Sequence, residues 1–65
     1  MTVVDHAKTY WYSFEHDAPE GPFESERDAR LAMLDDPRFD LDRPWRVSSR
    51  TGSRPLEAVM DYPGR

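Results

Sequence analysis

The chain of 65 residues contains no cysteine, two histidines and one lysine. Without cysteine it forms no disulfide, and two histidines alone cannot supply the four ligands of a structural zinc site. Folds of fewer than about 70 residues often depend on one of these two supports. The sequence therefore predicts a fold of marginal stability that is held by an apolar core or by self-association.

Long hydrophobic runs are also absent. No apolar stretch approaches the ~20 residues of a membrane helix, and the first ten residues lack the cationic, apolar and small-residue segments of a signal peptide. We expect a cytoplasmic protein, located in the bacterial host cytoplasm if a phage encodes it. Residues 1–65 are expected to form a single domain, with three Phe, three Tyr, two Trp and three Met available for its core.

The negative charge is concentrated in one part of the chain. Ten of the thirteen acidic residues fall within residues 15–42, against three arginines, so this stretch carries a formal charge of -7 within a total of -4. Residues 1–14 are neutral, and residues 43–65 carry five arginines against two acids. A strongly negative flank repels nucleic acid and attracts proteins whose surfaces bind phosphate.

Three segments alternate apolar and polar residues as strands do, and they are residues 8–15, 45–50 and 56–62. Residues 51–53, with a glycine at the centre, predict a hairpin turn between the last two. Residues 16–22 contain two prolines and a glycine, which predict a reversal of the chain after the first strand.

A helix is expected between the first and second strands. Ser25 predicts its N-cap, and the helix extends to Asp35 or Asp36, where Pro37 stops it. The order strand, helix, strand, strand predicts a small single α+β domain. In this domain one helix packs on one face of a three-stranded, mostly antiparallel sheet.

This helix has two possible buried faces. One contains Leu31 and Leu34, and the other contains Ala29, Ala32 and Met33. Because leucine buries more apolar area than alanine, we expect Leu31 and Leu34 to face the sheet, with Met33 or Ala32 at the margin.

The charged loop at residues 37–44 carries two further acids, Asp40 and Asp42. Phe39 and Leu41 are expected to anchor this loop against the core. Together with Asp35 and Asp36 its acids could bind Ca²⁺, but the spacing lacks the glycine and the closing glutamate of an EF-hand. We predict no metal site and no cofactor.

The acidic residues form the principal candidate binding surface. They are Asp17, Glu20, Glu24, Glu26, Asp28, Asp35, Asp36, Asp40 and Asp42. On a continuous helix, Glu24, Asp28 and Asp35 project within about 40° of one another and form one stripe. Carboxylates one turn apart lie about 6 Å apart, close to the spacing of successive phosphates, so a basic groove could accept them. The same charges could also serve only to solvate the helix.

The other polar sets carry weaker indications. Ser48, Ser49 and Ser53 have no histidine nearby in the sequence, and so small a fold rarely encloses a dry catalytic pocket, so we do not expect an enzyme. The arginines of residues 43–54 could form a nucleic-acid patch with Trp45 for stacking, but the net charge argues against it. We expect these arginines to pair with the acidic flank or to complete the solvent face of the hairpin, with Arg46 and Arg50 side by side.

Trp11 supports an alternative function. It is expected on the sheet face away from the helix, together with Thr9, Ser13 and Glu15. An exposed tryptophan there suits a protein-interaction or homodimerising module that uses this face. A tryptophan that packs over the sheet or under residues 1–7 is an equally good explanation.

The whole chain resembles the anti-CRISPR proteins of phages and mobile elements, the type I-C inhibitors in particular. The resemblance lies in small size, an acidic helix-plus-sheet build, the lack of cysteine and a residue usage typical of GC-rich genomes. It implies an inhibitor that blocks DNA binding by a type I CRISPR surveillance complex through DNA mimicry. The implied partners are basic CRISPR-associated subunits. We expect no direct contact with nucleic acid or membrane, and a monomer or weak homodimer.

Overall fold

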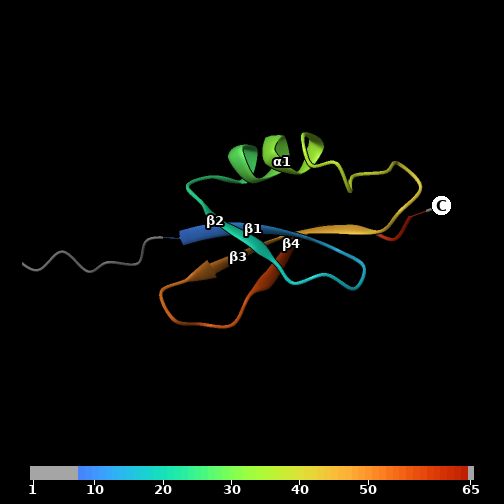
Figure 1. Ribbon diagram of the computed structural model, residues 1–65. Helices are drawn as coiled ribbons and strands as arrows, with labels where there is room; N and C mark the ends of the chain where they lie inside the picture. Colours follow the sequence, from blue (N-terminus) through green and yellow to red (C-terminus); the bar gives the residue numbers. More distant parts are fainter. Residues whose placement is uncertain (1–7, 65) are drawn as a thin grey trace, which may run out of the picture.

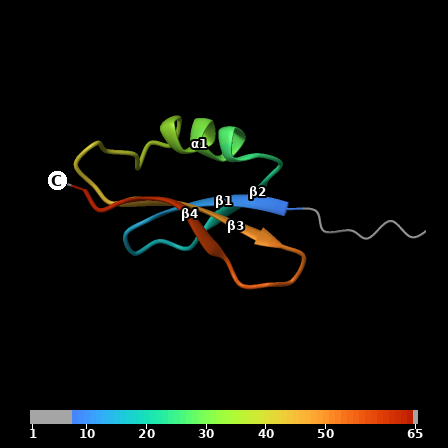
Figure 2. The ribbon, with the colours of Figure 1, turned by 180° about the vertical axis from the view of Figure 1, so that it is seen from behind.

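The computed structural model describes residues 8–64, which form one helix and four strands (Figure 1). The elements are β1 (Lys8–Phe14), β2 (Glu20–Phe23), α1 (Glu26–Leu34), β3 (Trp45–Thr51) and β4 (Glu57–Tyr62). The strands form a single antiparallel sheet in the order β2-β1-β3-β4. Both views show α1 on one face of this sheet (Figures 1 and 2), so the predicted α+β class is confirmed.

The predicted number of strands was wrong, because β2 lies in the segment expected to be only a chain reversal. β2 pairs with β1 through Tyr10 opposite Phe23 and Tyr12 opposite Glu20. Its central residues, Gly21 and Pro22, have low strand propensity, and proline has no N–H to donate to a neighbouring strand. Proline is therefore tolerated in edge strands, which pair on one side only, and β2 is an edge strand. The element order is therefore strand, strand, helix, strand, strand.

The predicted hairpin of β3 and β4 is present, and it contains one irregularity. Val47 lies opposite Met60, whereas the next residue, Ser48, lies opposite Ala58. Val59 is thus an extra residue on β4, as in a β-bulge. After the bulge the alternation is restored, so Met60 shares the inner, helix-facing side of the sheet with Val47.

The predicted start and end of the helix are confirmed. The backbone N–H of Asp28 donates to the Ser25 Oγ at 3.1 Å, which makes Ser25 the N-cap, and Asp35 is the C-cap. Glu24 precedes the cap. The continuous helical stripe of Glu24, Asp28 and Asp35 therefore does not form.

The preferred buried face of the helix was wrong. Ala29 and Met33 are buried, whereas Leu31 and Leu34 are 53% and 55% exposed. Below the helix, Tyr12 stacks on Phe23 with ring centroids 5.8 Å apart. Such large rings fill the layer from the sheet side, so the facing helix positions need small or flexible side chains.

Among residues 8–64, five buried hydrophobic residues form the core, and they are Tyr12, Phe14, Ala29, Met33 and Val47. Phe39 packs against this core as predicted. Leu41 does not, since it is 73% exposed. The N–H groups of Arg43 and Asp42 donate to the Asp40 carbonyl and Oδ1, which closes a turn with Leu41 at its corner. In the described part of the chain no helix is long and apolar enough to cross a membrane.

Candidate functional site

Three of the nine predicted acids converge on one arginine. The Arg38 guanidinium lies 2.9 Å from Asp36, 3.3 Å from Glu20 and 3.5 Å from Asp17. These acids come from three places, the segment after α1, strand β2 and the β1–β2 turn. Arg38 therefore joins the loop after the helix to the edge of the sheet.

Asp36 lies at the centre of this cluster and accepts hydrogen bonds from Arg38 and Tyr12. Arg38 donates to Asp36 Oδ1 through its backbone N–H at 2.8 Å and its Nε at 3.1 Å. The Tyr12 hydroxyl donates to Asp36 Oδ2 at 2.7 Å, and the guanidinium lies 5.2 Å from the centre of the Phe14 ring.

The pKa values in the cluster reflect these contacts. The hydrogen bonds from Arg38 hold the pKa of Asp36 well below its usual range, and those to Asp36 raise the pKa of Arg38. Burial raises the pKa of Tyr12, and the hydrogen bond to Asp36 adds to the increase. Asp36, Arg38 and Tyr12 therefore keep their usual charge at neutral pH. The contacts of Asp17, Glu20 and Asp36 with Arg38 hold the loop after the helix against the edge of the sheet.

The remaining predicted acids have a different environment. Glu26 forms a 3.4 Å pair with Arg30 one turn along α1. Four other acids form no ion pair within residues 8–64, and they are Glu24, Asp28, Asp35 and Asp40. All four are exposed, as is Asp42 in the loop.

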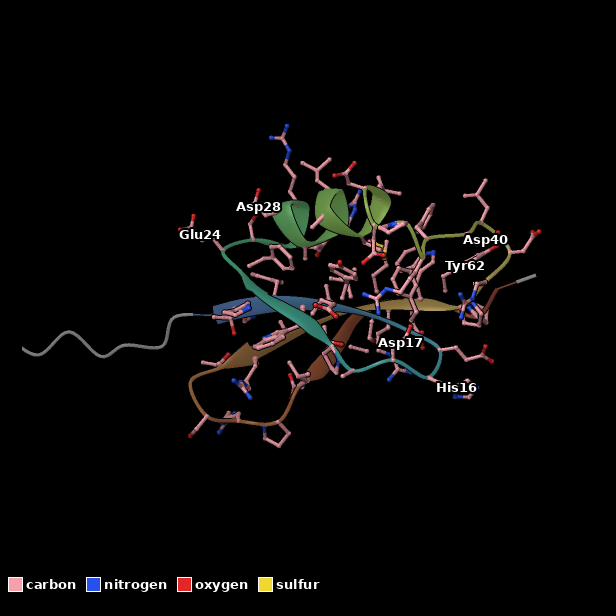
Figure 3. All side chains as sticks on the ribbon, viewed as in Figure 1. His16, Asp17, Glu24, Asp28, Asp40 and Tyr62 are labelled. Carbon is pink, nitrogen blue, oxygen red and sulfur yellow. The ribbon has the colours of Figure 1, made fainter. Side chains whose placement is uncertain are left out.

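These exposed acids do not form one compact patch. Figure 3 shows Glu24 and Asp28 close together at the start of α1 and Asp40 near the other end of the molecule. Asp28 and Asp35 share one side of the helix, about 10 Å apart along its axis. The acids thus extend along the layer formed by α1 and the loop.

The arginines of β3 lie on the opposite face of the sheet. Arg46 pairs with Asp61 of β4 at 3.3 Å, and the Arg50 guanidinium lies 5.3 Å from the centre of the Trp11 ring. The Arg50 Nε is buried there with no hydrogen-bond partner. These arginines do not neutralise the acids of the helix layer.

Trp11 is only half-exposed. Its indole N–H donates to Thr9 Oγ1 at 3.2 Å, and its ring lies against Gly21, where an added Cβ would be 2.8 Å from the ring. With Arg50 over it, Trp11 is packed on the sheet. The face it was expected to offer to a partner is therefore largely polar.

One surface feature was missed by the reasoning from sequence. A groove of about 450 Å³ separates α1 from β4 and is lined by Arg30, Met33, Leu34, Phe39, Leu41, Trp45, Met60 and Tyr62. Trp45 and Tyr62 stack at 5.6 Å on its floor. No local pattern in the sequence marked this groove, because its lining residues come from α1, the following loop, β3 and β4.

Among residues 8–64, no group of three or more His, Cys, Asp or Glu side chains could hold a metal ion. The candidate site consists of the exposed acids along the helix layer and the apolar groove beside it. Comparisons with protein-family models, with curated proteins and with solved structures found no match to this chain.

Proposed function

We propose that this chain is an acidic inhibitor protein that binds a basic, nucleic-acid-binding surface of a partner and thereby competes with nucleic acid. On the resemblance to anti-CRISPR proteins, the partner is the DNA-binding surface of a type I CRISPR surveillance complex. One observation carries the proposal. Residues 24–43 hold seven acids against four arginines, a formal charge of -3, and the acids outside ion pairs are exposed.

The contact residues of this proposal are fewer than the predicted set. Glu24, Asp28, Asp35 and Asp40 make no ion pair in the described residues, so pairing with a partner would break no internal bridge. Asp17, Glu20 and Asp36 instead hold Arg38. Exposed carboxylates steer association with a basic surface, and added salt screens this attraction.

The test is a competition experiment with a purified type I-C surveillance complex and fluorescently labelled target DNA. The protein should displace the DNA at about 50 mM salt and lose at least about tenfold in potency at about 300 mM. The triple variant Glu24→Lys, Asp28→Lys, Asp35→Lys should lose displacement while its circular dichroism remains that of a folded protein.

A matched triple variant controls for net charge. Glu15→Lys, Glu57→Lys, Asp61→Lys makes the same change in charge at exposed positions outside residues 24–43. It should retain most of the displacement. If the two triple variants are equally impaired, total charge and not the helix layer is responsible; if neither is impaired, the acidic surface is not the contact.

A further inference from the structure

The inner face of the sheet is covered by α1 over part of its width only. Four strands about 4.8 Å apart make a sheet about 14–19 Å wide, whereas a helix is about 10 Å across. α1 packs against β1, β2 and β3. The inner side chains of β4, Met60 and Tyr62, border the groove instead.

The groove has the composition of a binding surface. Its floor is the stacked pair Trp45 and Tyr62, and its rim carries Leu34 and Leu41, which are more than half exposed. Tryptophan and tyrosine are the residues that most often dominate binding energy at protein interfaces. Exposed apolar side chains gathered in a concave surface are typical of binding sites.

The charge around the groove is negative. Residues 35–43 hold four acids and two arginines, and Asp35 and Asp40 directly adjoin the rim leucines in sequence. The cation in the wall, Arg30, pairs with Glu26 at 3.4 Å, which reduces its repulsion toward another cation. A ligand with apolar groups at its centre and cations at its sides complements this arrangement.

Addition of a strand to the sheet is a less suitable mode of binding. The β2 edge contains Pro22, and the β4 edge is interrupted by the bulge at Val59. Antiparallel pairing of two β4 strands about Val59 would also set Glu57 against Asp61 of the second copy, and like charges directly opposite destabilise a sheet. The groove thus remains the open surface of the inner face.

We propose that the groove receives an amphipathic helix of a partner protein, which lies beside α1 as a second helix over β3 and β4. Its apolar side chains contact Leu34, Leu41 and Tyr62, and lysines or arginines on its flanks face the aspartates around the rim. The basic flanks rest on the proposed function, since they assume that the same partner meets the acids of the helix layer.

The test uses three synthetic helical peptides of about 15 residues. One carries a leucine face and lysine flanks, the second replaces its leucines by serine, and the third replaces its lysines by glutamate. Each is titrated into ¹⁵N-labelled protein and followed by amide chemical shifts. The leucine-lysine peptide should shift the amides of Met60 and Tyr62 and bind at least about tenfold more tightly than the other two.

Two variants assign the contact. Leu34→Ser with Leu41→Ser should lower the affinity for the leucine-lysine peptide about tenfold or more, whereas Leu31→Ser should change it less than about twofold. Leu31 is a matched control because it is exposed on the same helix but does not line the groove. All three side chains are more than half exposed, so the variants should remain folded.

Each of the other outcomes contradicts one part of the groove proposal. If the serine-lysine peptide binds as tightly and shifts Glu24 and Asp28, the groove is not the site, while the acidic contact of the proposed function remains. If the leucine-glutamate peptide binds the groove equally, the basic flanks are wrong, and with them the link to the proposed function. If no peptide shifts Met60 and Tyr62, docking in the groove is refuted, whatever the result of the DNA competition.

Discussion

The two halves of the inner sheet face differ in how their apolar side chains are covered. Over β1 and β2, α1 buries Tyr12 and Phe14 and the Arg38 cluster fastens the following loop. Over β4, Met60 and Tyr62 are only half-buried beside exposed leucines. The comparison shows that this small protein gains its stability on one half and leaves apolar surface exposed on the other. The first half serves the fold, and the second carries the groove that we propose as a binding site.

The largest loss of stability should come from a substitution in the half of the sheet that α1 covers. Replacement of buried Phe14 by alanine should cost about 3–5 kcal/mol, against a total stability of about 3–10 kcal/mol for a domain of this size. We expect Phe14→Ala to lose about a third or more of its free energy of unfolding, measured by urea denaturation followed by circular dichroism. Leu41→Ala is the control, because Leu41 lines the groove and is largely exposed. This variant should unfold in urea almost as the wild type does. A cooperative, near-wild-type transition for Phe14→Ala would contradict the assigned core.

Two adjacent residues of α1 sharpen the comparison. Met33 is buried and Leu34 is 55% exposed. Met33→Ala should lower the free energy of unfolding by about 2–4 kcal/mol, whereas Leu34→Ala should lower it by about 1 kcal/mol or less. Urea denaturation of the two variants measures both values. The reverse order would mean that the helix packs through its leucine face.

The Arg38 cluster should make stability depend on pH. The folded pKa of Asp36 lies below the ordinary value of 3.8, so ionised Asp36 stabilises the folded state above about pH 4. This contribution is lost as the pH falls from about 4 through the folded pKa.

Melting temperatures from pH 7 to pH 2 test this dependence. Asp36→Asn should melt below the wild type at pH 7, by less than the core variants do, and the difference should shrink below about pH 4. Asp40→Asn is the control, because Asp40 lies in the same loop outside the cluster. A difference that stays constant down to pH 2 would show that the Asp36 charge does not stabilise the fold.

The smallest effect should come from the pair on the opposite sheet face. Arg46 and Asp61 are each more than half exposed, so their 3.3 Å contact is screened by water and salt. Arg46→Ala should change the free energy of unfolding by about 0.5 kcal/mol or less. Arg38→Ala should lower the free energy of unfolding clearly more, because it leaves Asp36, which is largely shielded from water, without its charged partner. If urea denaturation gives the two variants equal losses in the free energy of unfolding, the Arg38 cluster stabilises the fold no more than the exposed pair does.

Part of the candidate site followed from the sequence. The concentration of acids in residues 15–42 is a property of the chain, and it predicted a negative flank. Which acids remain exposed and unbridged could not be predicted, because Arg38 meets Asp17 and Glu20 only after β2 and the loop have folded against each other. The groove was missed for a similar reason, since its walls come from the helix, the loop and β4.

The sequence by itself determined the local elements. Ser25 and Pro37 set the limits of α1, and alternation with a central glycine turn specified the hairpin of β3 and β4, because caps, turns and strand periodicity act between near neighbours. Only the tertiary structure decided which helix face is buried and whether the Gly21–Pro22 segment is a strand. Both depend on the space that the aromatic side chains of β1 leave and on the edge that β1 offers, and such long-range packing overrides local preference.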